Sequence, residues 1–430
     1  MADASTVAWI LFGGLGLLIL VRVPLGFALA IATAAAYAYT GDSFVNLAQS
    51  FYDSVNSFPL VAVPMFFLAG TVMESGGISR RLVGVAEAVI GNVRGGLGMV
   101  SVLASMFFSA ISGSGPATTA AVGGVMVPAM LKRKYPAPLS AAIVATGGTL
   151  GVLIPPSILM ILYGVIADQS ISELFLAALL PGLFVGFFLM FATYVICRFY
   201  GIKGTGEAFN WAHLLEKLWW AKLSLMVPVI ILGGIYAGIF TATESAVIAA
   251  FYGIFISMFV YREMDWKQLR SAVYSSAKMT GKLGILWGVS VAFGEVMTMY
   301  QIPTMLSSYL LGITSDPTCI LLIISAFLIF TGCFMNSMSQ VIIFTPIYLP
   351  IIMAAGIDPI HFCMVFVVNA EIGFLTPPLG TTLFVAMEQA GVSLGEISKA
   401  VLPFIGAYLI ATLVIILFPW LSLVLPKAFM

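Results

Sequence analysis

The chain consists of long apolar stretches that polar residues interrupt only at intervals. A helix needs about 20 mostly apolar residues to cross a bilayer, and most of these stretches reach that length. The pattern therefore predicts an all-α protein that crosses the membrane many times. The predicted spans are residues 5–22, 23–40, 58–74, 137–166, 173–198, 223–240, 244–261, 281–301, 359–388 and 397–425.

Two further apolar regions, residues 96–134 and 316–355, are interrupted in the middle. Each arm is shorter than the roughly 20 residues of a full crossing, so we predict two re-entrant helical hairpins. In the first, FSAISGSGPATTAAVGG (108–124) contains Gly113, Gly115 and Pro116, which interrupt a helix. Spans 137–166 and 359–388 are broken in the same way, by IPPS and TPPLG.

Composition fixes the class of protein. Hydrophobic residues make up 61% of the 430 positions, charged residues 8%, and the mean hydropathy is +1.10. Soluble domains carry about 25% charged residues, so we expect a polytopic membrane protein with no nucleic-acid partner. The four cysteines lack CxxC spacing, which indicates neither a disulfide framework nor a zinc site. The spans hold no Ser/His or paired-Asp constellation, so we expect no enzymatic activity.

Charge predicts the sidedness. With the loop after 58–74 in the cytoplasm, every Lys and Arg except Lys427 lies on the cytoplasmic side, as the positive-inside rule requires. Both termini then face outward, the first hairpin opens to the cytoplasm and the second to the outside. Hairpins counted as two full crossings give the same sidedness, so re-entrance depends on arm length alone. The amphipathic stretches 78–93 and 209–223 are expected to lie in the membrane interface.

The two halves of the chain are related. A shift of 222 residues aligns Pro128 with Pro350, Pro155 with Pro377, Pro156 with Pro378, Pro181 with Pro403, and Gly151 with Gly373. An odd number of crossings separates equivalent spans, so the repeats, residues 1–222 and 223–430, are inverted. Inverted repeats with helices broken at corresponding places are typical of secondary transporters with a site near the bilayer midplane.

Each break brings carbonyl-rich helix ends and hydroxyl groups to the same depth. Such hard oxygen ligands suit Na+, so the residues predict two sodium sites related by the repeat. The candidate ligands are Ser109, Ser112, Gly151, Ile154 and Pro156 in the first site, and Gly332, Cys333, Gly373, Thr376 and Pro378 in the second.

An anionic substrate is expected between the two sodium sites. No Lys or Arg lies deep in a predicted span, so the anion must rely on helix N-termini and hydroxyl or amide groups. The candidate substrate ligands are Ser114, Thr118, Ser157, Asn336, Thr381 and Thr382.

Several other polar residues keep two interpretations. Glu295 and Glu371 lie inside spans and are either functional or structural hydrogen-bonding groups. Glu244 either has a function or caps a helix start. The two histidines, His213 and His361, are expected in solvated loops.

The motifs SGSGPATTAAVGG, IPPS, TPPLG and GIFTATESA (238–246) resemble the large membrane subunit of a TRAP (tripartite ATP-independent periplasmic) transporter. The resemblance covers essentially the whole chain, with Ala242 where the family tends to have a proline. It implies an elevator mechanism in which a Na+ gradient drives uptake of a small organic acid, such as a C4-dicarboxylate or sialic acid. A periplasmic binding protein would deliver the substrate, and a small four-helix subunit would brace the scaffold in the bacterial inner membrane.

An elevator mechanism divides the chain into a part that moves and a part that stays still. The hairpins and broken spans would carry the site, and residues 1–57, 173–261 and 397–430 would form a static scaffold. The main alternative is a stand-alone Na+/carboxylate symporter, which transports without a soluble binding protein. A channel would not need two mirrored hairpins of opposite sidedness.

Overall fold

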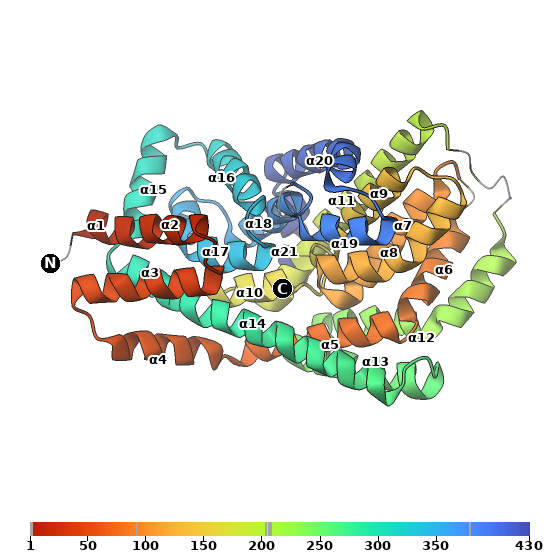
Figure 1. Cartoon of the computed structure of the whole chain (residues 1–430), viewed down its shortest axis with the longest axis horizontal. Helices are drawn as coiled ribbons and strands as arrows, with labels where there is room; N and C mark the ends of the chain where they lie inside the picture. The colour runs from red at the N-terminus through yellow and green to blue at the C-terminus, as the bar shows by residue number, and fades with distance from the viewer. Residues whose placement is uncertain (1–2, 92, 203, 205–208, 378–379) are drawn as a thin grey trace.

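The computed structural model is a bundle of helices elongated along one axis (Figure 1). It describes residues 3–430 except 92, 203, 205–208 and 378–379, and these described residues form no β-strand. Seven helices among them are long and apolar enough to cross a membrane. The expected class of all-α, multi-pass membrane protein is therefore confirmed.

The first half contains the first hairpin and the first broken span. Its elements are α1 (Ala4–Ala8), η1 (Trp9–Gly13), α2 (Gly14–Leu20), α3 (Leu25–Thr40), α4 (Phe44–Val55), η2 (Phe58–Val61), α5 (Ala62–Ser75), α6 (Ile78–Ile90), the hairpin α7 (Gly96–Ser112) and α8 (Gly115–Lys132), the broken span α9 (Ala137–Thr149), η3 (Leu150–Val152) and α10 (Ile158–Ala167), and α11 (Ile171–Phe199).

The second half repeats this plan. Its elements are α12 (Trp211–Tyr236), α13 (Ala242–Phe255), η4 (Ile256–Val260), α14 (Trp266–Met299), α15 (Ile302–Ile313), the hairpin α16 (Pro317–Gly332) and α17 (Ser337–Ala354), the broken span α18 (Pro359–Phe374) and α19 (Thr381–Ala390), α20 (Leu394–Leu417) and α21 (Trp420–Phe429). Both hairpins and both broken spans are thus interrupted where the sequence predicts.

The two hairpin tips reverse the chain with different local chemistry. In the first, Gly113 adopts φ +60°, a left-handed conformation that glycine accepts readily, and Ser114 is extended without a side-chain cap bond. In the second, the Asn336 side chain accepts a 2.8 Å hydrogen bond from the Ser339 N–H and caps α17. Ser114 therefore gives α8 no side-chain cap, whereas Asn336, the residue 222 positions later, caps α17.

Some predicted boundaries were wrong because helices continue through polar residues. The interfacial stretch 209–223 and the span 223–240 form one continuous helix, α12, which the Asn210 side chain caps. The span expected at 281–301 begins earlier, at Trp266 in α14, where Asp265 and Gln268 form a capping box. Polar residues such as Lys, Glu and Gln are good helix formers and do not end a helix by themselves, so polarity alone misplaced these helix ends.

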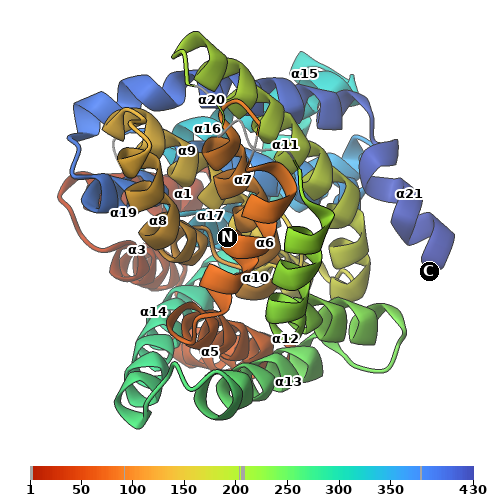
Figure 2. The same ribbon diagram turned by 90° about the vertical axis from the view of Figure 1, so that its right-hand side faces the viewer.

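The helices pack in two groups, seen in the end-on view of Figure 2. In one group α14 packs against α3, α4 and α5, and α13 packs against α5 and α12. In the other, both hairpins and broken spans pack together with α11 and α20, which contact α7 and α9 respectively. Helix α6 touches both groups, through α12 and α7.

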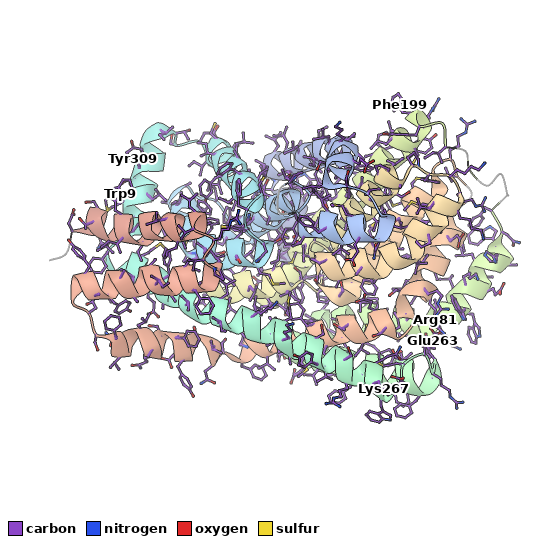
Figure 3. The ribbon with its side chains drawn as sticks, viewed as in Figure 1. Trp9, Arg81, Phe199, Glu263, Lys267 and Tyr309 are labelled. Atoms are coloured by element: carbon purple, nitrogen blue, oxygen red, sulfur yellow. The ribbon has the colours of Figure 1, made fainter. Side chains whose placement is uncertain are left out.

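A buried arginine anchors α6 at the end of the molecule where Figure 3 labels Arg81, Glu263 and Lys267, opposite Trp9 and Tyr309. Arg81 is 7% exposed and forms a 2.8 Å ion pair with Glu263. Its guanidinium carbon lies 3.5 Å from the ring centroid of Tyr261, and Nη1 donates to the carbonyl of Gly77 at 2.9 Å. The start of α6 is therefore fixed to the loop that follows η4.

Candidate functional site at the broken helices

The tip of the first hairpin docks into the break of the first broken span. The Ile158 N–H donates to the Gly113 carbonyl at 3.4 Å. Gly151 approaches the tip so closely that a Cβ there would lie 2.5 Å from Thr118 Oγ1 and 2.6 Å from the Ser114 carbonyl oxygen. A side chain at Gly151 would therefore displace the tip.

Hydroxyl groups line this contact. Ser112 and Thr118 share a 2.8 Å hydrogen bond, and Ser109 donates to the carbonyl of Ser105. A Cβ at Gly113 would lie 3.0 Å from the Pro156 carbonyl oxygen, so that carbonyl faces the tip. The structure thus brings Ser112, Gly151 and Pro156, three of the candidate ligands of the first sodium site, into one region together with Thr118.

The second hairpin meets the second broken span through a glycine pair. A Cβ on Gly332 would lie 2.6 Å from the Gly373 Cα, a separation that only two glycines allow. Thr376 donates to the Ile372 carbonyl at 2.8 Å, and Cys333 Sγ lies 3.4 Å from the Ile329 carbonyl oxygen. Pro378, the remaining candidate ligand of the second sodium site, lies outside the described residues.

The two repeats meet at the start of α8. Gly115, the first residue of α8, faces Glu371 on α18 and Thr382 on α19, with 3.3 Å between its Cβ position and Glu371 Oε2. Glu371 is 1% exposed, and its Oε1 accepts a 2.8 Å hydrogen bond from Ser337, the first residue of α17. The carboxylate therefore lies beside the first residue of both outbound hairpin helices, where we expected a substrate anion.

Most of the candidate substrate ligands are buried and already bonded. Ser157 caps α10 through the Met160 N–H, and Thr382 donates to the Phe374 carbonyl at 3.0 Å. Ser114 and Thr118 are also buried. Asn336 is exposed, and its side-chain oxygen accepts hydrogen bonds from Ser339, whereas Thr381 is half-buried and its hydroxyl oxygen is buried without a partner.

Two cavities flank the outbound hairpin helices between the two helix groups. One of ≈ 470 Å³ is lined by Ala120 and Gly124 of α8 together with Glu74 and Arg80. The other, of ≈ 690 Å³, is lined by Ile342 and Pro346 of α17 together with Glu295, and shifting Ala120 and Gly124 by 222 residues gives these α17 positions. The cavities thus border equivalent faces of the two repeats.

Within the part of the chain that the structure describes, no three His, Cys, Asp or Glu side chains converge as a metal site would require. A cation at the breaks would be held by hydroxyl and carbonyl oxygens, as Na+ is in broken transporter helices. The candidate ligands at both breaks fit that requirement, apart from the soft sulfur of Cys333.

The family follows from comparison with known proteins. A model of the DctM component of tripartite ATP-independent periplasmic transporters matches residues 12–421. The chain belongs to this family. It is therefore a large permease subunit of a TRAP transporter.

Relatives of this DctM-family chain are named for several different substrates. The isethionate TRAP permease protein DctMQ of Oleidesulfovibrio alaskensis is 42% identical over 94% of this chain, which spans 64% of that protein's length. The C4-dicarboxylate large permease DctM of Pseudomonas aeruginosa is 39% identical over 90% of this chain and 91% of its own length. The sialic acid large permease SiaM of Vibrio cholerae is 34% identical over 98% of both chains.

The fold is also similar to that of the YdaH transporter of Alcanivorax borkumensis. The TM-score is 0.65 at 16% sequence identity, with 89% of each chain covered. At this identity the likeness concerns the fold alone.

Three polar residues correct or refine the sequence expectations for this DctM-family chain. His361 lies in α18, is 2% exposed and contacts Ser422, so the solvated loop was a wrong expectation. Glu244 forms a capping box with Thr241, which confirms the capping interpretation. Glu295 accepts a hydrogen bond from Ser50.

Glu371 was not among the candidate ligands, although it belongs to the site by position. The sequence signal was available, because an acid inside an apolar span is a functional candidate by default. Its contact with the first hairpin follows from packing, which no local pattern reveals.

Proposed function

We propose that this permease subunit imports a small organic acid together with Na+ across the bacterial inner membrane, with both termini on the periplasmic side. A periplasmic binding protein delivers the substrate, and a small four-helix membrane subunit braces the scaffold. The substrate class is a small carboxylate or sulfonate, in keeping with relatives named for C4-dicarboxylate, sialic acid and isethionate.

The main support for this proposal is the contact between the hairpin tips and the breaks in the broken spans. Hairpin tips and broken spans from both halves place hydroxyl and carbonyl oxygens at two equivalent positions. Half-helix ends and unwound carbonyls of this kind bind coupling ions and anionic substrates in secondary transporters. Buried glycines such as Gly151 and Gly373 permit the close approach.

We further propose that the hairpins are re-entrant and move with the broken spans as one rigid unit against a scaffold. The scaffold expected from the sequence includes α11 and α20. These two helices pack against α7, α9 and α18, and α11 also packs against α20, so we assign them to the mobile unit. The group of α3, α4, α5, α12, α13 and α14 then remains as the scaffold.

Reconstituted uptake tests the proposal. The chain is co-reconstituted into proteoliposomes with the small subunit, and uptake of a labelled C4-dicarboxylate, sialic acid or isethionate is measured with its binding protein outside. An inward Na+ gradient should drive accumulation, and choline in place of Na+ should abolish it. Equal uptake without the binding protein would contradict the tripartite assignment and support a stand-alone symporter.

A further inference from the structure

The Glu371 carboxylate has one oxygen without a partner. Oε1 accepts the hydrogen bond from Ser337, whereas Oε2 has no hydrogen-bond partner although the residue is 1% exposed. A buried polar atom left unpaired costs free energy. The free oxygen therefore marks a place for a ligand.

Oxygens from both repeats border the side of Gly115 that lacks a side chain. A Cβ at Gly115 would lie 3.3 Å from Glu371 Oε2 and 3.5 Å from the carbonyl oxygen of Gly148, in the last turn of α9. One oxygen comes from the second broken span and one from the first. A small cation beside Gly115 would be within reach of both.

The balance of charge around the helix breaks also favours a bound cation. The inbound helices α7, α9, α16 and α18 end in carbonyl groups, and the outbound helices α8, α10, α17 and α19 begin with amide groups. Their partial charges, about half an elementary charge each, cancel in pairs. When it is ionised, Glu371 adds a negative charge that these helix ends do not compensate.

No basic side chain balances that charge among the described residues. Among all the residues that the structure describes, the ion pairs join Arg80 and Arg81 to Glu263, and His213 to Glu216. An unpaired carboxylate buried in a low-dielectric interior is strongly unfavourable. A bound cation removes the penalty.

We propose that Glu371 Oε2 and the Gly148 carbonyl bind a third Na+, beside Gly115 and separate from the two predicted sodium sites. The ion bridges the repeats and balances Glu371 when the mobile unit crosses the membrane. This inference rests on the proposed sodium coupling.

The number of bound ions can be counted from stability. An ion that binds only the folded state raises the unfolding temperature with its concentration, and the slope against log [Na+] grows with the number of ions. Unfolding of the purified chain is measured in NaCl at constant ionic strength, with choline chloride as the balancing salt. We expect the slope for Glu371→Gln to correspond to one bound ion fewer than the slope for the wild type. Glu388→Gln, which changes an exposed acid on α19, should keep the wild-type slope.

A second variant tests the site without altering its charge. Gly115→Ala places a methyl group between the two oxygens and should also lose one ion. Gly124→Ala on the same helix, where a Cβ meets open space, is the matched control. Comparing Gly115→Ala with Gly124→Ala tests the third sodium site even if Glu371→Gln does not fold.

The outcomes separate the two proposals. A Na+-specific slope that is the same in wild type and in Glu371→Gln or Gly115→Ala overturns the third site only. If Glu371→Gln keeps the wild-type slope against log [Na+] but changes how the unfolding temperature depends on pH, the third sodium site is overturned in favour of a bound proton. A wild-type chain equally stable in both salts overturns sodium coupling and the third site together.

Discussion

At the scale of single residues, side-chain hydroxyls at the breaks are held by neighbouring groups. Ser112 shares its hydrogen bond with Thr118, and Thr376 donates to Ile372 one turn back. These bonds leave each hydroxyl oxygen lone pairs, because a hydroxyl donates once and accepts twice. Both hydroxyls can therefore serve as cation ligands without losing their present bonds.

Removing both hydroxyls tests their role in coupling. Ser112→Ala combined with Thr376→Ala should raise the Na+ concentration for half-maximal uptake, because each break loses one oxygen ligand. The measurement is uptake against [Na+] in proteoliposomes, and Thr318→Ala at the start of α16 is the control. An unchanged Na+ dependence in the double variant would show that these hydroxyls are not ligands.

Arg81 supports the fold rather than the site. Arg81→Ala should lower the free energy of unfolding by about 3 kcal/mol, because Glu263 would lose the buried one of its two arginine partners and keep only the exposed Arg80. Arg80→Ala removes a pair whose arginine side chain is 64% exposed, and such surface pairs contribute about 0–1 kcal/mol. Unfolding of the purified variants measures both, and equal losses would mean that burial does not set the strength of this anchor.

At the scale of elements, the hairpin tips differ in accessibility. Ser114 is 6% exposed and lies against Gly151, whereas Asn336 is exposed. Both tips are nonetheless expected at membrane depth if the hairpins are re-entrant.

Single cysteines at the tips test this arrangement in a background without the four native cysteines. A cysteine at Asn336 should react faster than one at Ser114 with a small aqueous thiol reagent, and substrate plus Na+ should protect both. Labelling rates with and without ligand measure the effect, with Phe199→Cys as an exposed control. Tip cysteines labelled fully from opposite aqueous sides, whatever the ligand, would indicate helices that cross the membrane.

At the scale of the whole molecule, the two helix groups share a contact suited to a disulfide. A Cβ at Gly294 on α14 would lie 3.6 Å from the Pro346 Cβ on α17, close to the mean disulfide separation of about 3.8 Å. Within the proposed mobile unit, a Cβ at Gly147 would lie 3.4 Å from the Ser105 Cβ. One pair joins the groups and the other stays inside one group.

The two crosslinks should affect transport differently. Gly294→Cys with Pro346→Cys should arrest uptake when oxidised and recover on reduction, because the hairpin can no longer move past α14. Gly147→Cys with Ser105→Cys should retain uptake in both states. Uptake that continues through a complete Gly294–Pro346 crosslink would exclude rigid-body movement and favour local gating.

The sequence by itself determined the class of protein and the positions of the helix breaks, and it predicts the relation between the halves. These follow from local physics: apolar length, the helix-breaking action of Gly113 and Pro116, and proline spacing that recurs after 222 residues. The motifs also indicated the family, which the comparison confirms. The sodium ligands, the sidedness and the re-entrance stay predictions.

Only the tertiary structure decided which broken segments meet. The contact of Gly115 with Glu371, the close pair of Gly332 and Gly373, and the burial of His361 join residues whose local sequences say nothing about each other. The proposed assignment of α11 and α20 to the mobile unit rests in the same way on the faces they pack against. In a uniformly apolar helix every face suits either lipid or protein, so hydrophobic pattern cannot choose the partner, and close packing makes that choice.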